Sequence, residues 1–211
     1  MPHPTHQLTD PADSAARPVR ATGVAQFSWV LLVIGVIGWA ASAQLVLERL
    51  ALYADPDYIT TCDISPFISC GEVFRTAQAS LFGFPNPLIG IVAFAVVITT
   101  AVALLAGARF ARWYWVGLQL GVTAGMAFVG WLWFQALFTI HILCLYCMVV
   151  WAMMIVMFIA TTAHSLRTGV LPAGPGVQRF AAEWWWVVAL LLVLATAASV
   201  LVTFAAAFFP A

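Results

Sequence analysis

The sequence has few charged residues and no lysine. Charged residues make up only 8% of its 211 residues, whereas soluble domains usually carry about 25%. Hydrophobic residues make up 64%, and a soluble chain this apolar could not cover its own surface. The formal net charge is zero, so the composition gives no reason to expect a nucleic-acid partner. These absences indicate that the solvent of this protein is a lipid bilayer.

Apolar segments long enough to cross a bilayer, which takes roughly 20 residues, lie at 26–47, 88–106, 113–160 and 184–209. The third is too long for one crossing, because such a helix would reach roughly 70 Å against a hydrocarbon core of ~30 Å. We expect it to form two spans that reverse near residues 137–143. The sequence thus predicts an all-α membrane protein with a four-helix transmembrane bundle at 26–163 and a fifth transmembrane helix within 184–211.

The polar segments complete this arrangement. Residues 1–25 contain several prolines and are expected to form a disordered tail. Residues 48–87 are expected to form a loop after the first span, and residues 164–183 a loop before the fifth. Ala41-Ser42-Ala43 resembles a signal-peptide cleavage site. The apolar run continues past it to Leu47, so we expect an uncut anchor.

The arginines indicate how the chain is oriented in the membrane. Five spans put the two termini on opposite sides. Six of the eight arginines fall on the side of the N-terminus: Arg17, Arg20, Arg109, Arg112, Arg167 and Arg179. The bias of positive residues toward the cytoplasm places the N-terminus there. The 48–87 loop, the 137–143 reversal and the C-terminus are then outside a plasma or inner membrane.

Three glycines share one face of the expected third span. Gly117, Gly121 and Gly125 recur every four residues. This spacing is typical of helices that pack closely through small residues. We therefore predict a close helix contact there and assign these glycines no chemistry.

All four cysteines fall on the predicted outer side, where disulfides persist. Cys144-Leu145-Tyr146-Cys147 stands at the expected start of the fourth span, and its spacing puts both sulfurs on one helix face. Unpaired N–H groups at a helix start favour the reactive thiolate form. A structural disulfide gains little from closing so short a loop. This pattern favours a redox-active pair.

The other two cysteines lie in the 48–87 loop. Ser69 and Glu72 fit a capping box at the start of a helix that holds Cys70 in its first turn. Apolar residues then repeat at helical spacing as far as Leu81, which predicts a short amphipathic helix at the membrane surface. Cys62 lies in the extended segment before it and is expected to be the more exposed of the two.

Three interpretations of the four cysteines stay open on these grounds. They form a redox relay, two structural disulfides in a protein that is not an enzyme, or a metal site with four thiolate ligands. A zinc ion accepts four thiolates, but two of them would come from a loop. Four cysteines outside the membrane fit structural disulfides as well as a relay.

The two pairs come in a definite order, with Cys62-x7-Cys70 in the first outer loop and Cys144-x2-Cys147 opening the fourth span. This order resembles the vitamin K epoxide reductase (VKOR) family, specifically its bacterial homologues. Two further segments resemble the same family: Cys70-Gly-Glu-Val-Phe-Arg-Thr76 and Phe84-Pro-Asn86-Pro-Leu-Ile-Gly90. The resemblance covers roughly residues 26–163. DsbB-type oxidases also pass electrons from thiols to a quinone, but their Cys-x-x-Cys lies in the earlier outer loop.

The resemblance implies a four-helix bundle around a quinone, either menaquinone or ubiquinone. It also implies roles for the cysteines. Cys144 and Cys147 would be the active-site pair, with Cys147 nearest the quinone. Cys62 and Cys70 would be the shuttle pair, with Cys62 meeting a partner. Many bacterial members continue into a thioredoxin-like domain, whereas this chain stops at Ala211, so we expect a separate DsbA-like thioredoxin-fold partner.

The resemblance also suggests residues that contact the quinone. Asn86 resembles a family asparagine that hydrogen-bonds a quinone carbonyl, and Thr76 takes the place of a family serine. Bulky residues near the expected reversal are candidates for the pocket wall: Trp131, Phe134, Leu137 and Phe138. The alternative for each of these four is an ordinary lipid-facing or core side chain.

Overall fold

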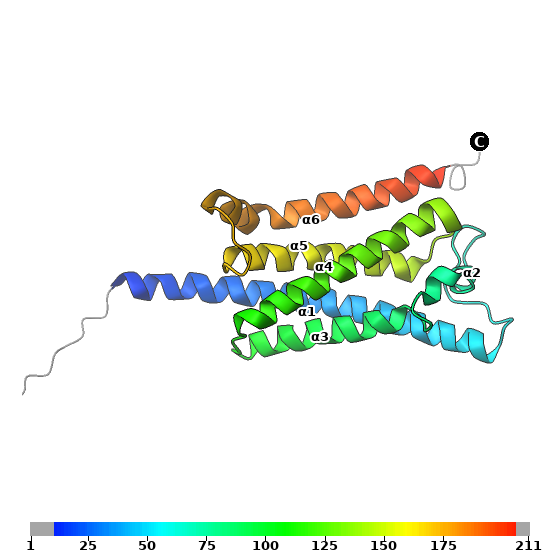
Figure 1. The fold of residues 1–211 in the computed structure, drawn as a ribbon, viewed down its shortest axis with the longest axis horizontal. Helices are drawn as coiled ribbons and strands as arrows, with labels where there is room; N and C mark the ends of the chain where they lie inside the picture. The colour runs from blue at the N-terminus through cyan, green and yellow to red at the C-terminus, as the bar shows by residue number, and fades with distance from the viewer. Residues whose placement is uncertain (1–10, 206–211) are drawn as a thin grey trace, which may run out of the picture.

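The computed structural model describes residues 11–205 (Figure 1). Within that range, five helices are long and apolar enough to cross a membrane: α1 (Pro11–Ala54), α3 (Pro87–Leu105), α4 (Arg112–Gln135), α5 (Leu145–Arg167) and α6 (Pro175–Thr203). Two short helices, α2 (Cys70–Phe74) and η1 (Ala77–Ser80), lie between α1 and α3. One turn of π-helix, η2 (Ala136–Ile140), continues α4. The predicted all-α membrane architecture is confirmed.

Four helices form the bundle, and α6 lies outside it (Figure 1). α1 packs against both α3 and α5, and α4 packs against α5, while α6 runs along α5. The connection from α1 to α3 and the turn from η2 to α5 lie at the same end of the bundle. We call this the cysteine end, because all four cysteines lie there.

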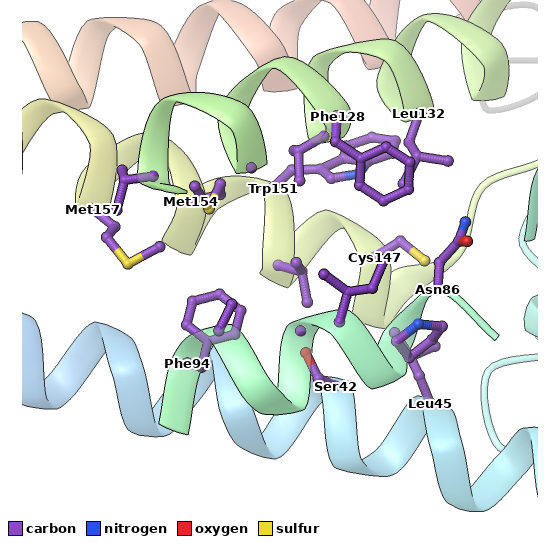
Figure 2. Close-up of a pocket in the computed structure, with 18 of the residues that line it drawn as sticks. Ser42, Leu45, Asn86, Phe94, Phe128, Leu132, Cys147, Trp151, Met154 and Met157 are labelled. Atoms are coloured by element: carbon purple, nitrogen blue, oxygen red, sulfur yellow. The ribbon is translucent and has the colours of Figure 1, made fainter. Parts of the chain in front are cut away.

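A cavity of about 540 Å³ lies inside the bundle (Figure 2). Its lining comes from α1, α3, α4 and α5 and from the α1–α3 connection. Gly117, Gly121 and Gly125 of α4 line it. A Cβ at Gly117 or Gly121 would have no neighbour within 4 Å. The predicted close packing is therefore wrong for these two glycines, which instead leave room beside α4.

Close helix packing through glycine occurs between α1 and α3. A Cβ at Gly38 of α1 would overlap the ring of Phe94, and one at Gly90 of α3 would overlap the side chain of Ser42. Both glycines let the two backbones approach, as small residues do in membrane helices. The backbones of α1 and α3 therefore approach each other closely at these two glycines.

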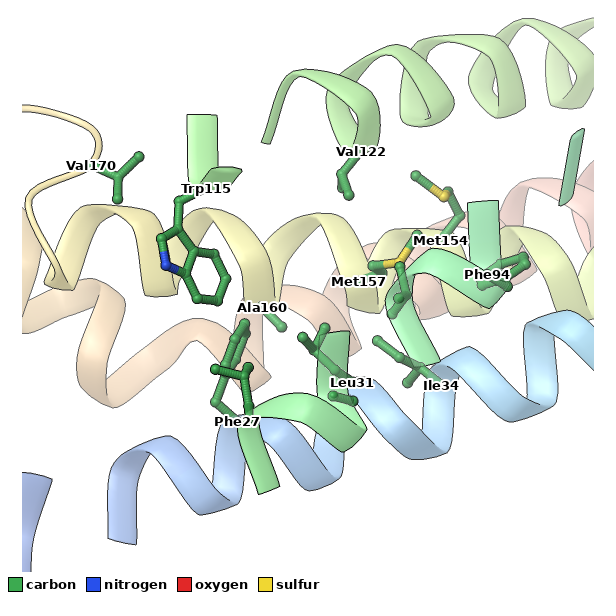
Figure 3. Close-up of a cluster of buried hydrophobic side chains, with 13 residues drawn as sticks. Phe27, Leu31, Ile34, Phe94, Trp115, Val122, Met154, Met157, Ala160 and Val170 are labelled. Atoms are coloured by element: carbon green, nitrogen blue, oxygen red, sulfur yellow. The ribbon is translucent and has the colours of Figure 1, made fainter. Parts of the chain in front are cut away.

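A buried apolar cluster joins all four bundle helices (Figure 3). Leu31 of α1, Trp115 of α4 and Met157 of α5 belong to it, together with Phe94 of α3. Phe94 and Met157 also line the cavity. The cluster and the cavity thus share one wall, so the packing that holds the helices together also sets the shape of the cavity.

The helices are longer than the hydropathy pattern predicts. α1 begins at Pro11, within the segment expected to form a disordered tail; residues 1–10 lie outside the described range. α1 also continues to Ala54, past the predicted end of the first span. Hydropathy marks the edge of the hydrocarbon layer, whereas a helix keeps its internal hydrogen bonds beyond that edge.

The loop before the last helix is shorter than predicted. α5 ends at Arg167 and α6 begins at Pro175, which leaves 168–174 in place of 164–183. Pro175 is the first helical residue of α6, a position that suits proline because its missing N–H would have no helical partner there. The predicted end of this span near residue 209 lies outside the described range.

Replacing Gly90 by leucine is expected to destabilise the bundle, whereas Gly121→Leu is not. The new side chain at position 90 would overlap Ser42, and overpacking typically costs ~1–3 kcal/mol. The new side chain at position 121 would enter open space. Thermal unfolding of both variants in the same detergent checks this: only Gly90→Leu should melt at a lower temperature. Equal midpoints would contradict the close α1–α3 contact.

Candidate active site

Three sulfur atoms meet at the cysteine end. Cys62 and Cys70 form a disulfide with a Cα–Cα distance of 5.6 Å. Cys144 and Cys147 are free thiols. The Sγ atoms of Cys70 and Cys144 lie 3.1 Å apart. Thiol–disulfide exchange needs an attacking sulfur beside a disulfide sulfur, and this arrangement provides one.

Backbone hydrogen bonds bring Cys70 to Cys144. The N–H of Leu143 donates to the carbonyl of Phe67 (2.8 Å), and the N–H of Ser69 donates to the carbonyl of Leu143 (3.0 Å). These bonds form a single parallel bridge between the two segments. Cys70 follows Ser69 and Cys144 follows Leu143, so the register of the bridge places the two sulfurs side by side.

The predicted helix start at Ser69 is confirmed. Its Oγ accepts the N–H of Glu72 at 3.1 Å, which caps α2. The N–H of Ser69 is already used by Leu143, so the reciprocal half of the capping box is replaced by the bridge. The predicted continuous helix to Leu81 is wrong, because Thr76 has an extended backbone that separates α2 from η1.

The predicted position of the second pair at a helix start is also confirmed. Cys144 is the N-cap of α5, and its Sγ accepts the N–H of Cys147 at 3.4 Å. The chain reverses just before it, at His141, which has a left-handed backbone with φ of 56°. Cys144 therefore contacts Cys70 on one side and Cys147 on the other.

Cys62 was expected to be the more exposed of the two loop cysteines, but the structure buries both of them. Cys62 is 1% exposed and Cys70 is fully buried. The carboxylate of Asp63 folds the loop inward, because it accepts the N–H of Thr60 (2.8 Å), the hydroxyl of Ser69 (2.7 Å) and the N–H of Gly71 (3.1 Å). A protein partner therefore has no access to the disulfide in this conformation.

The hydrogen bonds to Asp63 also change how it titrates. Burial alone would raise the pKa of Asp63, but hydrogen bonds from Ser69, Thr60 and Gly71 outweigh it and hold this pKa below its usual value. Its contribution to loop stability is therefore present at neutral pH. That contribution is lost as the pH falls through the lowered value.

The cavity begins beside Cys144 and Cys147. Cys144 and Cys147 both line it, and Figure 2 shows Cys147 and Asn86 at the same end. Asn86 is 9% exposed. Its Nδ2 donates to the carbonyl of Gln78 (2.6 Å), and its Oδ1 accepts the N–H of Leu81 (3.2 Å). These bonds fix the amide, and its second N–H has no partner among the described residues.

Thr76 also lines the cavity, but it differs from Asn86 in what it offers. Its hydroxyl donates to the carbonyl of Val73 at 2.7 Å. A hydroxyl has one hydrogen, so Thr76 can only accept a hydrogen bond from a molecule in the cavity. Asn86 is therefore the better placed donor.

The aromatic residues predicted to wall the pocket lie elsewhere. Phe134 and Phe138 are about half exposed and pack on each other, with ring centroids 4.9 Å apart. Leu137 is buried in a separate cluster with Leu143. None of the three lines this cavity. The α4 residues that do so include Gly121, Gly125, Phe128 and Leu132.

These α4 residues recur every three or four positions, so helical periodicity carried the correct signal. The prediction instead relied on closeness in sequence to the expected reversal near 137–143, where a π-helical turn and a left-handed residue follow α4. Trp151 and Met154 of α5 complete this wall (Figure 2). The correct wall is therefore one face of α4 together with one face of α5.

Three cysteine sulfurs lie close enough to hold a metal ion. The Sγ atoms of Cys62, Cys70 and Cys144 are within 4.8 Å of one another. Cys62 and Cys70 are bonded to each other, however, and zinc binds thiolates. A metal site with four thiolate ligands would therefore require this disulfide to be reduced first.

Comparison with protein-family models gives a match over residues 29–162, to the vitamin K epoxide reductase family. The chain belongs to this family. A search of curated proteins found no match. VKOR membership implies a quinone-linked disulfide oxidoreductase, and it confirms the resemblance inferred from the order of the cysteines. The match covers α3 and α4 in full, α1 and α5 in part, and all four cysteines.

Asp63→Asn is expected to expose the Cys62–Cys70 disulfide at neutral pH. The amide loses one acceptor for the three donors that fold the loop. In the unmodified protein, reduction by a phosphine should accelerate only as the pH falls below about 3.9, the ordinary pKa of Asp. In Asp63→Asn it should be fast at pH 7. Quantifying free thiols over a pH series measures both rates.

The matched control for this experiment is Asp57→Asn. Asp57 lies in the same loop and is exposed. Its substitution should leave the protected rate at pH 7 unchanged. An Asp63→Asn protein as slow as the control would contradict the assigned role of Asp63.

Proposed function

We propose that this protein generates disulfides in a DsbA-like thioredoxin-fold partner and passes the electrons to a membrane quinone. The 3.1 Å approach of Cys70 Sγ to Cys144 Sγ carries this proposal. It links a loop disulfide to a thiol pair that lines an apolar cavity. VKOR membership supports the same chemistry.

The first half of the reaction takes place at the loop pair. A partner thiolate attacks Cys62, which breaks the Cys62–Cys70 bond and releases the Cys70 thiolate. The second thiol of the partner then attacks the partner sulfur that is bonded to Cys62. This releases oxidised partner and leaves Cys62 as a thiol, so two electrons have entered the loop pair.

The second half passes these electrons inward. Cys70 attacks Cys144 in the Cys144–Cys147 disulfide, forms a Cys70–Cys144 bond and releases Cys147. Cys62 then attacks Cys70, which reforms Cys62–Cys70 and releases Cys144. The redox state of this structure, with a loop disulfide and two free thiols, is the state that follows this step.

The cavity fits a quinone head group. It is mostly apolar, as suits a flat ring carrying a hydrocarbon tail, and its volume of about 540 Å³ is within the range of small-molecule sites. Asn86 offers an N–H to a carbonyl near Cys147. A menaquinone or ubiquinone bound there would take up two electrons and two protons. Cys147 and Cys144 supply these electrons and return to the disulfide.

The distribution of arginines supports an orientation. Arg109 and Arg112 lie at the end of the bundle opposite the cysteines, as does Arg167 at the end of α5. We therefore place that end in the cytoplasm and the cysteine end outside a plasma or inner membrane. Thiol oxidation would then occur in the compartment where disulfides persist.

A non-enzymatic protein with two structural disulfides is the alternative. It would leave the free thiols of Cys144 and Cys147 unexplained. It would also give no role to the contact between Cys70 and Cys144 or to the cavity beside Cys147. These observations favour the relay.

Cys62→Ala should abolish oxidation of a reduced DsbA-like protein and preserve quinone reduction by a small dithiol. The small dithiol can reduce the Cys144–Cys147 pair directly, whereas the protein partner needs Cys62. Cys147→Ala should abolish quinone reduction with both donors and accumulate the Cys70–Cys144 bond. Quinol absorbance and mass spectrometry of non-reduced digests measure these outcomes. Full activity of Cys147→Ala would contradict the relay.

Asn86→Asp should raise the KM for quinone about tenfold, the effect of losing roughly one hydrogen bond. The carboxylate keeps an acceptor for Leu81 but has no N–H for a quinone carbonyl. Thr76→Val should change KM less, because the Thr76 hydroxyl already donates to Val73. Steady-state kinetics with a small dithiol and varied quinone test this. An equal or larger effect of Thr76→Val would refute Asn86 as the main donor.

A further inference from the structure

Glu48 is a buried carboxylate near the end of α1. It is 2% exposed. It accepts hydrogen bonds from Gln44 Nε2 (2.9 Å), Thr61 Oγ1 (2.6 Å) and the Thr61 N–H (3.3 Å). Burying a charge is costly unless polar partners satisfy it. One of its two partners, Thr61, belongs to the loop that carries Cys62.

The hydrogen bonds of Glu48 connect it, through Thr61, to residues that precede Cys62 and Cys147. Thr61 directly precedes Cys62, and its Oγ1 also lies 3.1 Å from the hydroxyl of Tyr146. Tyr146 directly precedes Cys147. The carboxylate therefore ties the segment before Cys62 to α1 and, through Thr61, to the start of α5.

Other contacts hold the rest of the loop independently of Glu48. The bridge at Leu143 fixes the residues before Cys70. Arg49, the neighbour of Glu48, donates to the carbonyl of Phe74 and to Ser80 Oγ (3.3 Å). Asp63 connects parts of the loop to each other and not to α1. Releasing Glu48 would therefore detach Thr61, and with it Cys62, from α1, while Asp63 still ties Thr60 to Ser69. The bridge at Leu143 would keep Cys70 in place.

We propose that Glu48 is a positioning residue for Cys62. It holds Thr61, and with it Cys62, on the bundle, which hides Cys62 from the partner and presents its sulfur to Cys70 when their disulfide reforms. Partner attack then requires the Glu48–Thr61 bonds to open. This inference rests on the proposed relay and adds control over when Cys62 is accessible.

The two consequences of weakening this contact have opposite signs. Attack of the partner on Cys62 becomes faster, because the loop opens more often. Return of Cys62 to Cys70 becomes slower, because the loop no longer guides it. A residue that only stabilises the fold would not speed one step and slow the other.

The first test uses a Cys147→Ala background, in which three cysteines share one disulfide. Cys144 attacks Cys70, forms Cys70–Cys144, breaks Cys62–Cys70 and releases Cys62 as a thiol that takes up the proton of Cys144. No oxidant is needed. Glu48→Gln should shift the ratio toward Cys70–Cys144 about tenfold, the effect of losing one hydrogen bond to a charged group. Acid quenching, alkylation and mass spectrometry measure the ratio.

The second test uses the four-cysteine protein without quinone. Glu48→Gln should speed reduction of Cys62–Cys70 by a reduced DsbA-like protein about tenfold. Thr61→Val should act in the same direction but less, because the Thr61 N–H still reaches Glu48. Glu72→Gln is the matched control, since that exposed carboxylate lies 3.9 Å from Arg75 and away from residues 58–62. It should change neither measurement.

The outcomes separate this inference from the relay. An unchanged ratio and rate in Glu48→Gln, with the Cys70–Cys144 bond still forming, overturn the role of Glu48 alone. Slowing of both steps also overturns it, in favour of a merely structural role. Absence of any Cys70–Cys144 bond in the Cys147→Ala protein overturns the relay itself. If Glu48→Gln does not fold, Thr61→Val decides between the same outcomes.

Discussion

The contact between the sulfurs of Cys70 and Cys144 is the constraint on which the rest of this structure depends. Thiol–disulfide exchange needs the two sulfurs in contact, and Cys70 and Cys144 are separated by 74 positions in the chain. The bundle brings their two segments to the same end, and the bridge at Leu143 sets their register. Cys144, as N-cap of α5, then stands between Cys70 and the cavity. A change that shifts the bridge would separate the two halves of the site without altering any cysteine.

Two carboxylates, Asp63 and Glu48, act in different ways on the loop that carries Cys62 and Cys70. Asp63 gathers donors from within the loop and makes it compact. Glu48 takes donors from the loop while standing on α1, so it fastens that compact loop to the bundle. The loop is therefore a small folded unit with its own internal contacts, and its attachment at Glu48 is a separate contact. Loss of the attachment at Glu48 would therefore loosen the segment before Cys62, while the bridge at Leu143 still holds the segment before Cys70.

Local signals predicted most of the fold and part of the site. Apolar run length gave the five spans, and the cap at Ser69 and the helix start at Cys144 follow from neighbouring residues alone. Burial of Cys62 was missed because it depends on the side-chain contacts of Asp63 with Thr60, Ser69 and Gly71 and on Glu48 of another element. The place of Phe138 was missed because it depends on the turn after α4, and that of Phe134 because it lies on a face of α4 that does not line the cavity. Gly117 and Gly121 were misread because the same spacing serves a helix contact or an open wall, and only the neighbouring helix decides which.

The bridge at Leu143 consists of backbone groups, and this affects how the sequence can vary. Every residue type carries a carbonyl and every one except proline carries an N–H, so many side chains at positions 67, 68 and 143 can support the same alignment of sulfurs. The lengths of the segments before Cys70 and Cys144 are less free, because one inserted residue would turn the next side chain to the other side. Across related chains, the spacing between the bridge and each cysteine should therefore vary less than the residues that form it.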